Sequence, residues 1–221
     1  MRTGLRIDVE LPRLNAMYRH ERLGLRSPGD VRPFRIDGRG ELLRSSNQRQ
    51  TSECAAYTMA GAIEYARLRW LDVAEQIDPH PIYLKAKELD GLEGEGTTLD
   101  AVIQAAIALG WIKRTMEPEQ VRTLPELKAA LRKYRVVLGG FEVDDSLSTV
   151  QPDGWWTGLG EILGGHAMLV CGLAEDTEEW IGCQGSWGEQ GYGWHGFIRM
   201  MPDVWRERWC YGLAFDVRPL K

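Results

Sequence analysis

The stretch Gln48-Arg49-Gln50-Thr51-Ser52-Glu53-Cys54 runs directly into Ala, Met, Ile, Tyr and Leu residues at helical spacing. Up to Trp70 this run contains one glycine, Gly61, and no proline, which predicts a long, largely buried helix with Cys54 in its first turn. A thiol at a helix start is well placed to ionise, because unpaired amide N–H groups and the helix dipole stabilise negative charge there. A structural cysteine is the alternative, since free cysteine is among the most buried residue types.

A second stretch, Gly164-Gly165-His166-Ala167-Met168-Leu169-Val170, has the pattern of an apolar strand that opens with a histidine. The two glycines before His166 allow another chain to approach the backbone closely. A cysteine at a helix start and a histidine on a distant strand are the arrangement expected of a cysteine nucleophile and its base. A lone histidine is more often structural, so this interpretation depends on both stretches together.

The remaining periodicity divides the chain into a helical and a β-rich part. Further helices are predicted over residues 82–89, 98–109 and 125–134, the second capped by Thr97 or Thr98 and ended by Gly110. Strands are predicted over residues 135–143, 166–172, 179–183, 196–200 and 211–217. We therefore predict a single α+β domain over residues 1–221, with a helical lobe over 41–134, an antiparallel β-rich lobe over 135–221 and a cleft between them.

Composition excludes several other classes. The chain is 43% hydrophobic and 27% charged with a net charge of −5, as in ordinary globular proteins, and this acidic balance argues against nucleic acid as the partner of the whole domain. No apolar run approaches the roughly 20 residues that span a bilayer, so neither membrane attachment nor a signal peptide is expected. The four cysteines form no C-x-x-C pair, which argues against structural zinc. No metal or other cofactor is expected, and a reducing, cytoplasmic location fits best.

The N-terminal segment differs in charge from the rest of the chain. Residues 1–50 contain eleven Arg, no Lys and six acidic residues, whereas the remainder is acidic. Turn sequences at 28–30 and 37–40 predict that residues 1–40 form a mostly irregular, Arg-rich arm on an acidic body. A nucleic-acid-binding tail is the alternative. A further hypothesis is that the arm limits access to the cleft, which unchanged turnover and thiol reactivity after deletion of residues 1–35 would contradict.

Taken in order, these motifs resemble those of the papain-like cysteine peptidases, especially their compact bacterial and phage members, over about residues 42 to 200. Residues 48–54 resemble the family's Gln followed six residues later by its nucleophile, and residues 164–168 resemble its Gly-x-His-Ala strand. The family's Asn-Ser-Trp-Gly…Gly-Trp-Gly…Gly-Tyr-x-Arg tail is similar to Ser186-Trp187-Gly188, Gly191-Tyr192-Gly193 and Gly196-Phe197-Ile198-Arg199. The segments after its central helix are similar to Pro81-Ile82-Tyr83-Leu84 and Gly96-Thr97-Thr98-Leu99.

The resemblance implies a papain-like two-lobed fold and a cysteine peptidase that hydrolyses peptide or isopeptide bonds in a peptide or protein substrate. It implies that Cys54 is the nucleophile, held as a thiolate by the helix end and by protonated His166. The Gln48 amide and the Cys54 backbone N–H would stabilise the oxyanion. Gln50 is the competing amide for this role, but its spacing does not fit the motif. The implied substrate-binding residues are Ser52, Glu53, Gly96, Gly165 and Trp187.

One departure from the family concerns its third catalytic group. The Asn expected before Ser-Trp-Gly is Gly185, which cannot orient the imidazole. Gln184, one residue earlier, faces the other way along a regular strand and substitutes only across a bulge or twist. Slow or narrow activity is expected, because packing alone then sets the imidazole. Two alternatives stay open: a weak or inactive pseudoenzyme that acts as a binding or accessory module, and a cell-wall amidase or acyl transferase on the same scaffold.

Overall fold

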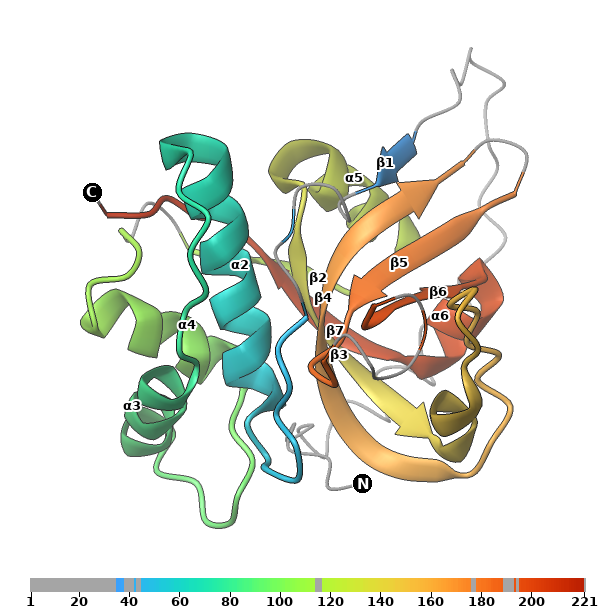
Figure 1. Ribbon diagram of the computed structural model, residues 1–221, viewed down its shortest axis with the longest axis horizontal. Coiled ribbons are helices and arrows are strands. Elements are labelled where there is room, and N and C mark those ends of the chain that lie inside the picture. Colours follow the sequence, from blue (N-terminus) through green and yellow to red (C-terminus); the bar gives the residue numbers. More distant parts are fainter. Residues whose placement is uncertain are drawn as a thin grey trace.

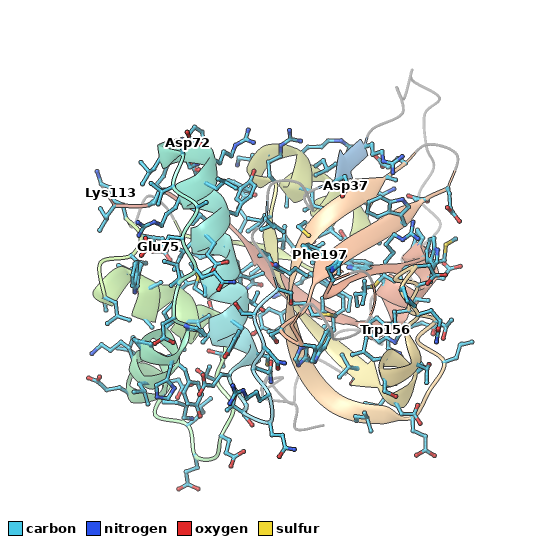
Figure 2. All side chains as sticks on the ribbon, in the orientation of Figure 1. Asp37, Asp72, Glu75, Lys113, Trp156 and Phe197 are labelled. Atoms are coloured by element: carbon cyan, nitrogen blue, oxygen red, sulfur yellow. The ribbon has the colours of Figure 1, made fainter. Side chains whose placement is uncertain are left out.

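The predicted α+β architecture is confirmed in a computed structural model, which describes residues 35–37, 42, 45–113, 117–175, 178–188, 193 and 195–220. Three helices, α2, α3 and α4, lie together on one side of a lobe built on an antiparallel sheet of seven strands (Figure 1). Side chains from both parts fill the space between α2 and the sheet (Figure 2). The fold is therefore two-lobed, with the central helix at the boundary.

The central helix, α2 (Cys54–Leu71), begins at the predicted residue and is almost wholly buried as far as Ala66. Small side chains along this helix let α3 (His80–Asp90), α4 (Leu99–Ala108) and the sheet approach it closely. Thr98 caps α4 as predicted, because its side chain accepts a hydrogen bond from the Ala101 N–H at 3.1 Å. None of the helices within the described residues has the length and apolarity that a bilayer crossing requires.

The sheet has the strand order β2-β7-β3-β4-β5-β6, with β1 paired to the end of β4. Its strands are β1 (Arg35–Asp37), β2 (Glu119–Val121), β3 (Val137–Asp144), β4 (Ile162–Ala174), β5 (Trp180–Gln184), β6 (Phe197–Met200) and β7 (Trp209–Ala214). Two further helices, α5 (Leu124–Tyr134) and α6 (Pro202–Arg208), and a short 3-10 helix over Asp145–Thr149 (η2) complete the fold. The strand that carries His166, β4, is the longest and contacts three neighbours, so its position is strongly fixed.

Alternate residues of β4 face two separate cores. Ala167 and Leu169 pack in the cluster that contains α2, whereas Met168 and Val170 pack in a second cluster, to which α5 and α6 contribute. This alternation follows from the two-residue period of a strand. Because both faces of β4 are covered, the sheet holds the histidine strand rigidly between the two cores.

Several elements differ from the sequence predictions. β4 begins at Ile162, four residues before the predicted strand, and β1 forms within the arm that is predicted to be mostly irregular. Residues 1–34 and 38–40 of that arm lie outside the described residues. The lobe division at residue 134 stays a sequence prediction. The helix α5, which precedes this boundary, packs on the sheet. The C-terminal residues return to the helices, where the Lys113 N–H donates to the Arg218 carbonyl at 2.9 Å.

The side chain of Glu64, on α2, makes the free energy of unfolding depend on pH. Its carboxylate is buried and accepts a hydrogen bond from the Ile77 N–H at 2.8 Å, and burial raises the pKa of Glu64 to about 7. The unfolded carboxyl loses its proton first, so the contribution of Glu64 to the free energy of unfolding falls as pH rises from about 4.5 to about 7, by up to about 3 kcal/mol. We therefore expect Glu64→Gln to gain stability relative to the parent across this window, measured by urea unfolding. Glu88→Gln, at an exposed position, is the control, and a constant difference between Glu64→Gln and the parent would contradict the prediction.

Candidate active site

The thiol at the start of α2 lies against the strand that carries the histidine. The backbone N–H of Ala167 donates to Cys54 Sγ at 3.4 Å. The first intrahelical bond of α2 runs from the Tyr57 N–H to the Glu53 carbonyl, and no described side chain caps this helix end. The structure thus brings together the two stretches that sequence singled out, and places the sulfur where helix and strand both supply backbone donors.

His166 lies in an environment that disfavours charge. Its side chain is 1% exposed, and neither ring nitrogen has a hydrogen-bond partner among the described residues. Burial lowers the pKa of His166 to about 3, so the imidazole is neutral near pH 7. The thiolate–imidazolium pair implied by the resemblance stays a prediction, and burial of this ring opposes it.

Gln184 forms no hydrogen bond with this imidazole in the structure. It lies opposite Leu169 in the β4–β5 ladder and points at α2, where its Oε1 is 3.2 Å from the position that a Cβ on Gly61 would take. The register irregularity in this ladder falls between Val170 and Gly172, on β4, rather than beside Gln184. The ring of Trp187 stacks on that of His166, with centroids 4.8 Å apart and planes inclined by 14°.

Both polar atoms of the Gln48 side-chain amide form hydrogen bonds. Its Nε2 donates to the Thr51 carbonyl at 2.7 Å, and its Oε1 accepts from the Ser186 hydroxyl. The Gln48 backbone N–H also donates to the Ser186 carbonyl at 2.9 Å. An amide nitrogen carries two N–H groups, and Thr51 takes only one of them. Ser186, which the motif contained but to which sequence assigned no role, therefore orients the amide proposed for the oxyanion.

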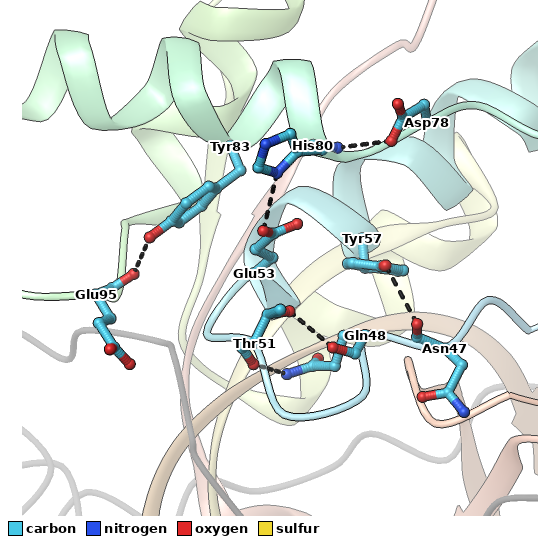
Figure 3. Close-up of polar contacts among 9 residues, drawn as sticks. All are labelled: Asn47, Gln48, Thr51, Glu53, Tyr57, Asp78, His80, Tyr83 and Glu95. Atoms are coloured by element: carbon cyan, nitrogen blue, oxygen red, sulfur yellow. Dashed lines mark hydrogen bonds and ion pairs between the residues drawn. The ribbon is translucent and has the colours of Figure 1, made fainter.

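The residues before Cys54 join a polar cluster that reaches α3 (Figure 3). Glu53 Oε1 lies 3.0 Å from His80 Nδ1, and Tyr83 donates its hydroxyl to the Glu95 carbonyl at 2.6 Å. The Ser52 hydroxyl donates to Glu95 Oε2 at 3.1 Å. The sequence analysis gave neither Glu95 nor His80 a role, because no local pattern shows that α3 and its following loop fold back to the nucleophile.

The two predicted substrate-binding glycines lie in ordered backbone. Gly165 precedes His166 in β4 and pairs with Glu142. The carbonyl of Gly96 accepts from Lys87 Nζ at 3.1 Å. Their contacts with a substrate backbone stay predictions.

The other cysteines have a different environment. All three are buried, and burial raises the pKa of Cys210 to about 12 and the pKa of Cys183 well above its usual value. Cys183 and Cys210 are therefore protonated thiols, and of the four cysteines only Cys54 lies at a helix start. Among the residues that the structure describes, no group of His, Cys, Asp or Glu side chains could hold a metal ion.

Comparison with solved structures places this arrangement in a known fold. Xylellain, a cysteine protease from Xylella fastidiosa, has a TM-score of 0.70 and 16% identity, covering 98% of this chain and 96% of that one. Bromelain from Ananas comosus, in complex with the E64 inhibitor, has a TM-score of 0.66 and 16% identity, covering 83% and 99%. Digestive procathepsin L 3 of Tenebrio molitor larval midgut has a TM-score of 0.62 and 14% identity, covering 86% and 71%. No protein-family model and no curated protein matches the chain. The papain-like fold implied by the resemblance is thus confirmed.

The buried imidazole predicts acid sensitivity. The pKa of His166 is about 3 in the folded protein and near 6.5 when unfolded, so the unfolded state binds the proton first as pH falls. The contribution of His166 to the free energy of unfolding therefore decreases as pH falls from about 6.5 to about 3, by about 1.4 kcal/mol per pH unit at most. We expect His166→Phe, which keeps an aromatic ring but does not titrate, to gain stability relative to the parent between pH 6.5 and 4.5. Urea unfolding at several pH values measures this, and His195→Phe, at an exposed position, is the control. Parallel pH profiles for parent and His166→Phe would show that the ring is not buried.

Proposed function

We propose that this protein is a thiol-dependent hydrolase of peptide or isopeptide bonds, with Cys54 as nucleophile and His166 as its base. The observation that supports this most strongly is the hydrogen bond from Ala167 to Cys54 Sγ, since it joins the helix-start thiol to the histidine strand. The papain-like fold supports it further, because the solved structures that share this fold include cysteine proteases from a bacterium and a plant.

The reaction follows from the groups at the site. Neutral His166 accepts the Cys54 thiol proton as the sulfur attacks the substrate carbonyl carbon and forms a C–S bond. The carbonyl oxygen becomes an oxyanion, to which the second Gln48 N–H and the Cys54 backbone N–H are the proposed donors. When the C–N bond breaks, the imidazolium returns the proton to the leaving amine, and a thioester remains. Water, deprotonated by His166, then hydrolyses the thioester and regenerates the thiol.

The site is closed in this structure. Cys54 is 0% exposed and His166 1% exposed, so substrate can reach the sulfur only after the structure opens. This closure, together with Gly185 at the position of the orienting group, favours a second candidate: a papain-like pseudoenzyme that serves as a binding or accessory module. Thiol reactivity separates the two proposals, because a pseudoenzyme needs no activated sulfur.

An activated pair predicts selective alkylation. We expect iodoacetamide to modify Cys54 near pH 6 faster than Cys171, Cys183 or Cys210, and His166→Ala to slow the Cys54 reaction about tenfold or more, because the base is lost. Intact mass and peptide mapping over time give the four rates in one sample. Equal Cys54 rates in parent and His166→Ala would contradict the hydrolase proposal and favour the pseudoenzyme.

The oxyanion assignment predicts a specific loss of turnover. Loss of one oxyanion donor costs about 10²–10³ in kcat, so we expect a decrease of that size in Gln48→Ala, with little change in Cys54 alkylation because no oxyanion forms in that reaction. New peptide ends in a protein digest, counted by mass spectrometry, measure turnover against a Cys54→Ala blank. Gln50→Ala is the matched control, since this exposed amide is close in sequence but lies outside the motif. Equal losses in Gln48→Ala and Gln50→Ala would contradict the assignment.

A further inference from the structure

A buried carboxylate directly precedes the nucleophile in the chain. Glu53 is 8% exposed, and its Oε1 lies 3.0 Å from Nδ1 of His80 on α3. Its other oxygen, Oε2, forms no hydrogen bond with the described residues and is not fully enclosed by them. Because a neutral imidazole carries no charge that could offset a carboxylate, Glu53 is a negative centre unless His80 is protonated. The residue next to the sulfur therefore has an anionic oxygen that is open to a further partner.

The surroundings of Glu53 are acidic. The Ser52 hydroxyl donates to Glu95 Oε2 at 3.1 Å, which brings a second carboxylate to the same end of α2. Burial raises the pKa of Tyr83, whose ring lies beside these residues (Figure 3), and the charges of Glu53 and Glu95 raise it further. The helical side of the site thus has a negative field.

The cations in this region do not cancel that field. Lys87 Nζ donates to two backbone carbonyls of the loop that follows α3, and it lies 3.5 Å from Asp90 Oδ1. Burial and the charge of Glu53 raise the pKa of Tyr57, whereas the exposed Arg49 lowers it by less. Lys87 is therefore already engaged, and the effect of Arg49 is the smaller one.

The proposed reaction determines which part of a substrate meets Glu53. The leaving amine receives its proton from His166, so this part of the substrate lies toward β4. The attacked carbonyl carbon binds Cys54, and the residue that carries it extends to the other side of the scissile bond, toward α3. The side chain of Glu53 points to α3, where it contacts His80. The substrate residue before the cleaved bond is therefore the one that meets the carboxylate.

We propose that Glu53 is a specificity-determining residue of this enzyme, and that its preferred substrates carry a lysine or arginine immediately before the bond that is cleaved. This inference rests on the proposed hydrolase function and names the class of substrate for the same site. His80 holds Oε1 of Glu53, and the cationic side chain of the substrate binds at Oε2. A glutamate at the same substrate position is disfavoured, because Glu53 and Glu95 repel it.

A peptide library measures this preference. Peptides from a chymotryptic digest of a proteome are treated with the parent or with Glu53→Gln, and mass spectrometry identifies the residue before each newly cut bond. We expect the parent to favour lysine and arginine over glutamine by about tenfold or more, and Glu53→Gln by less than about twofold, because the amide carries no charge. Glu88→Gln is the matched control, since it removes an exposed carboxylate from the helix that carries His80, and it should keep the profile of the parent. Equal preferences in parent and Glu53→Gln would overturn the proposal.

Acetylation of the library separates charge from side-chain length. It removes the positive charge of lysine and leaves arginine unchanged. We expect the parent to lose its preference for lysine and to retain its preference for arginine. An undiminished preference for acetylated lysine would overturn the proposal, because the site would then recognise the apolar stem of the side chain.

Charged thiol reagents test Glu53 without any turnover. Two methanethiosulfonates, one with a trimethylammonium group and one with a sulfonate group, modify Cys54, and peptide mapping gives the rate of each. We expect the ratio of the cationic to the anionic rate to be about fivefold or more higher in the parent than in Glu53→Gln, because only the parent has a carboxylate beside the sulfur. Equal ratios would overturn the proposal.

The two proposals fail in different ways. If the parent shows no peptide cleavage that depends on Cys54 and His166, the hydrolase proposal fails, and the specificity fails with it. If such cleavage occurs without a preference for lysine and arginine, only the assignment of Glu53 is wrong. Circular dichroism confirms that the variants are folded, and the acetylated library tests the proposal on the parent alone if Glu53→Gln does not fold.

Discussion

The contact between the first residue of α2 and the middle of β4 is the constraint on which the rest of the site depends. A backbone N–H of the sheet donates to a side chain of the helical lobe, so the sulfur lies at the contact between the two lobes, within the core that they share. β4 can serve this purpose because both of its faces are buried and it has strand neighbours on both sides. The thiol thus meets a surface that is already rigid, which is the condition for preorganised chemistry.

Two buried titratable groups, one on α2 and one on β4, change the free energy of unfolding in opposite directions as pH changes. The pKa of Glu64 is raised, and the pKa of His166 is lowered, by the same physical cause, removal from water. Between about pH 4.5 and 6.5 the unfolded state takes up a proton at the histidine and releases one at the carboxyl, so the two contributions largely cancel. Together these two groups therefore add little net dependence on pH in this window, although each alone contributes a sizeable one.

Sequence predicted those parts of the structure that are encoded locally. The apolar spacing after Cys54 defined α2, and Thr98 defined the start of α4, because periodicity and caps are properties of neighbouring residues. The strands β1 and β2 were missed, since each has three residues and exists through pairing with a distant strand. The protonation state of His166 could not be predicted either, because burial is a property of the assembled cores. Trp187 was named from its motif, but its stack on His166 appears only in three dimensions.

The length of chain between the joined segments determines when the site can form. Cys54 and Ala167 are 113 positions apart, and β7, the last strand in sequence, lies between β2 and β3 in the sheet. Such non-local pairing forms slowly, because the entropy of closing long loops must be lost before the contacts are gained. During synthesis the apolar central helix therefore emerges long before the strands that cover it, and the newly made chain depends on late events, or on chaperones, to protect it from aggregation. The same delay keeps the sulfur without its strand partner until the 113 residues that follow Cys54 have been made.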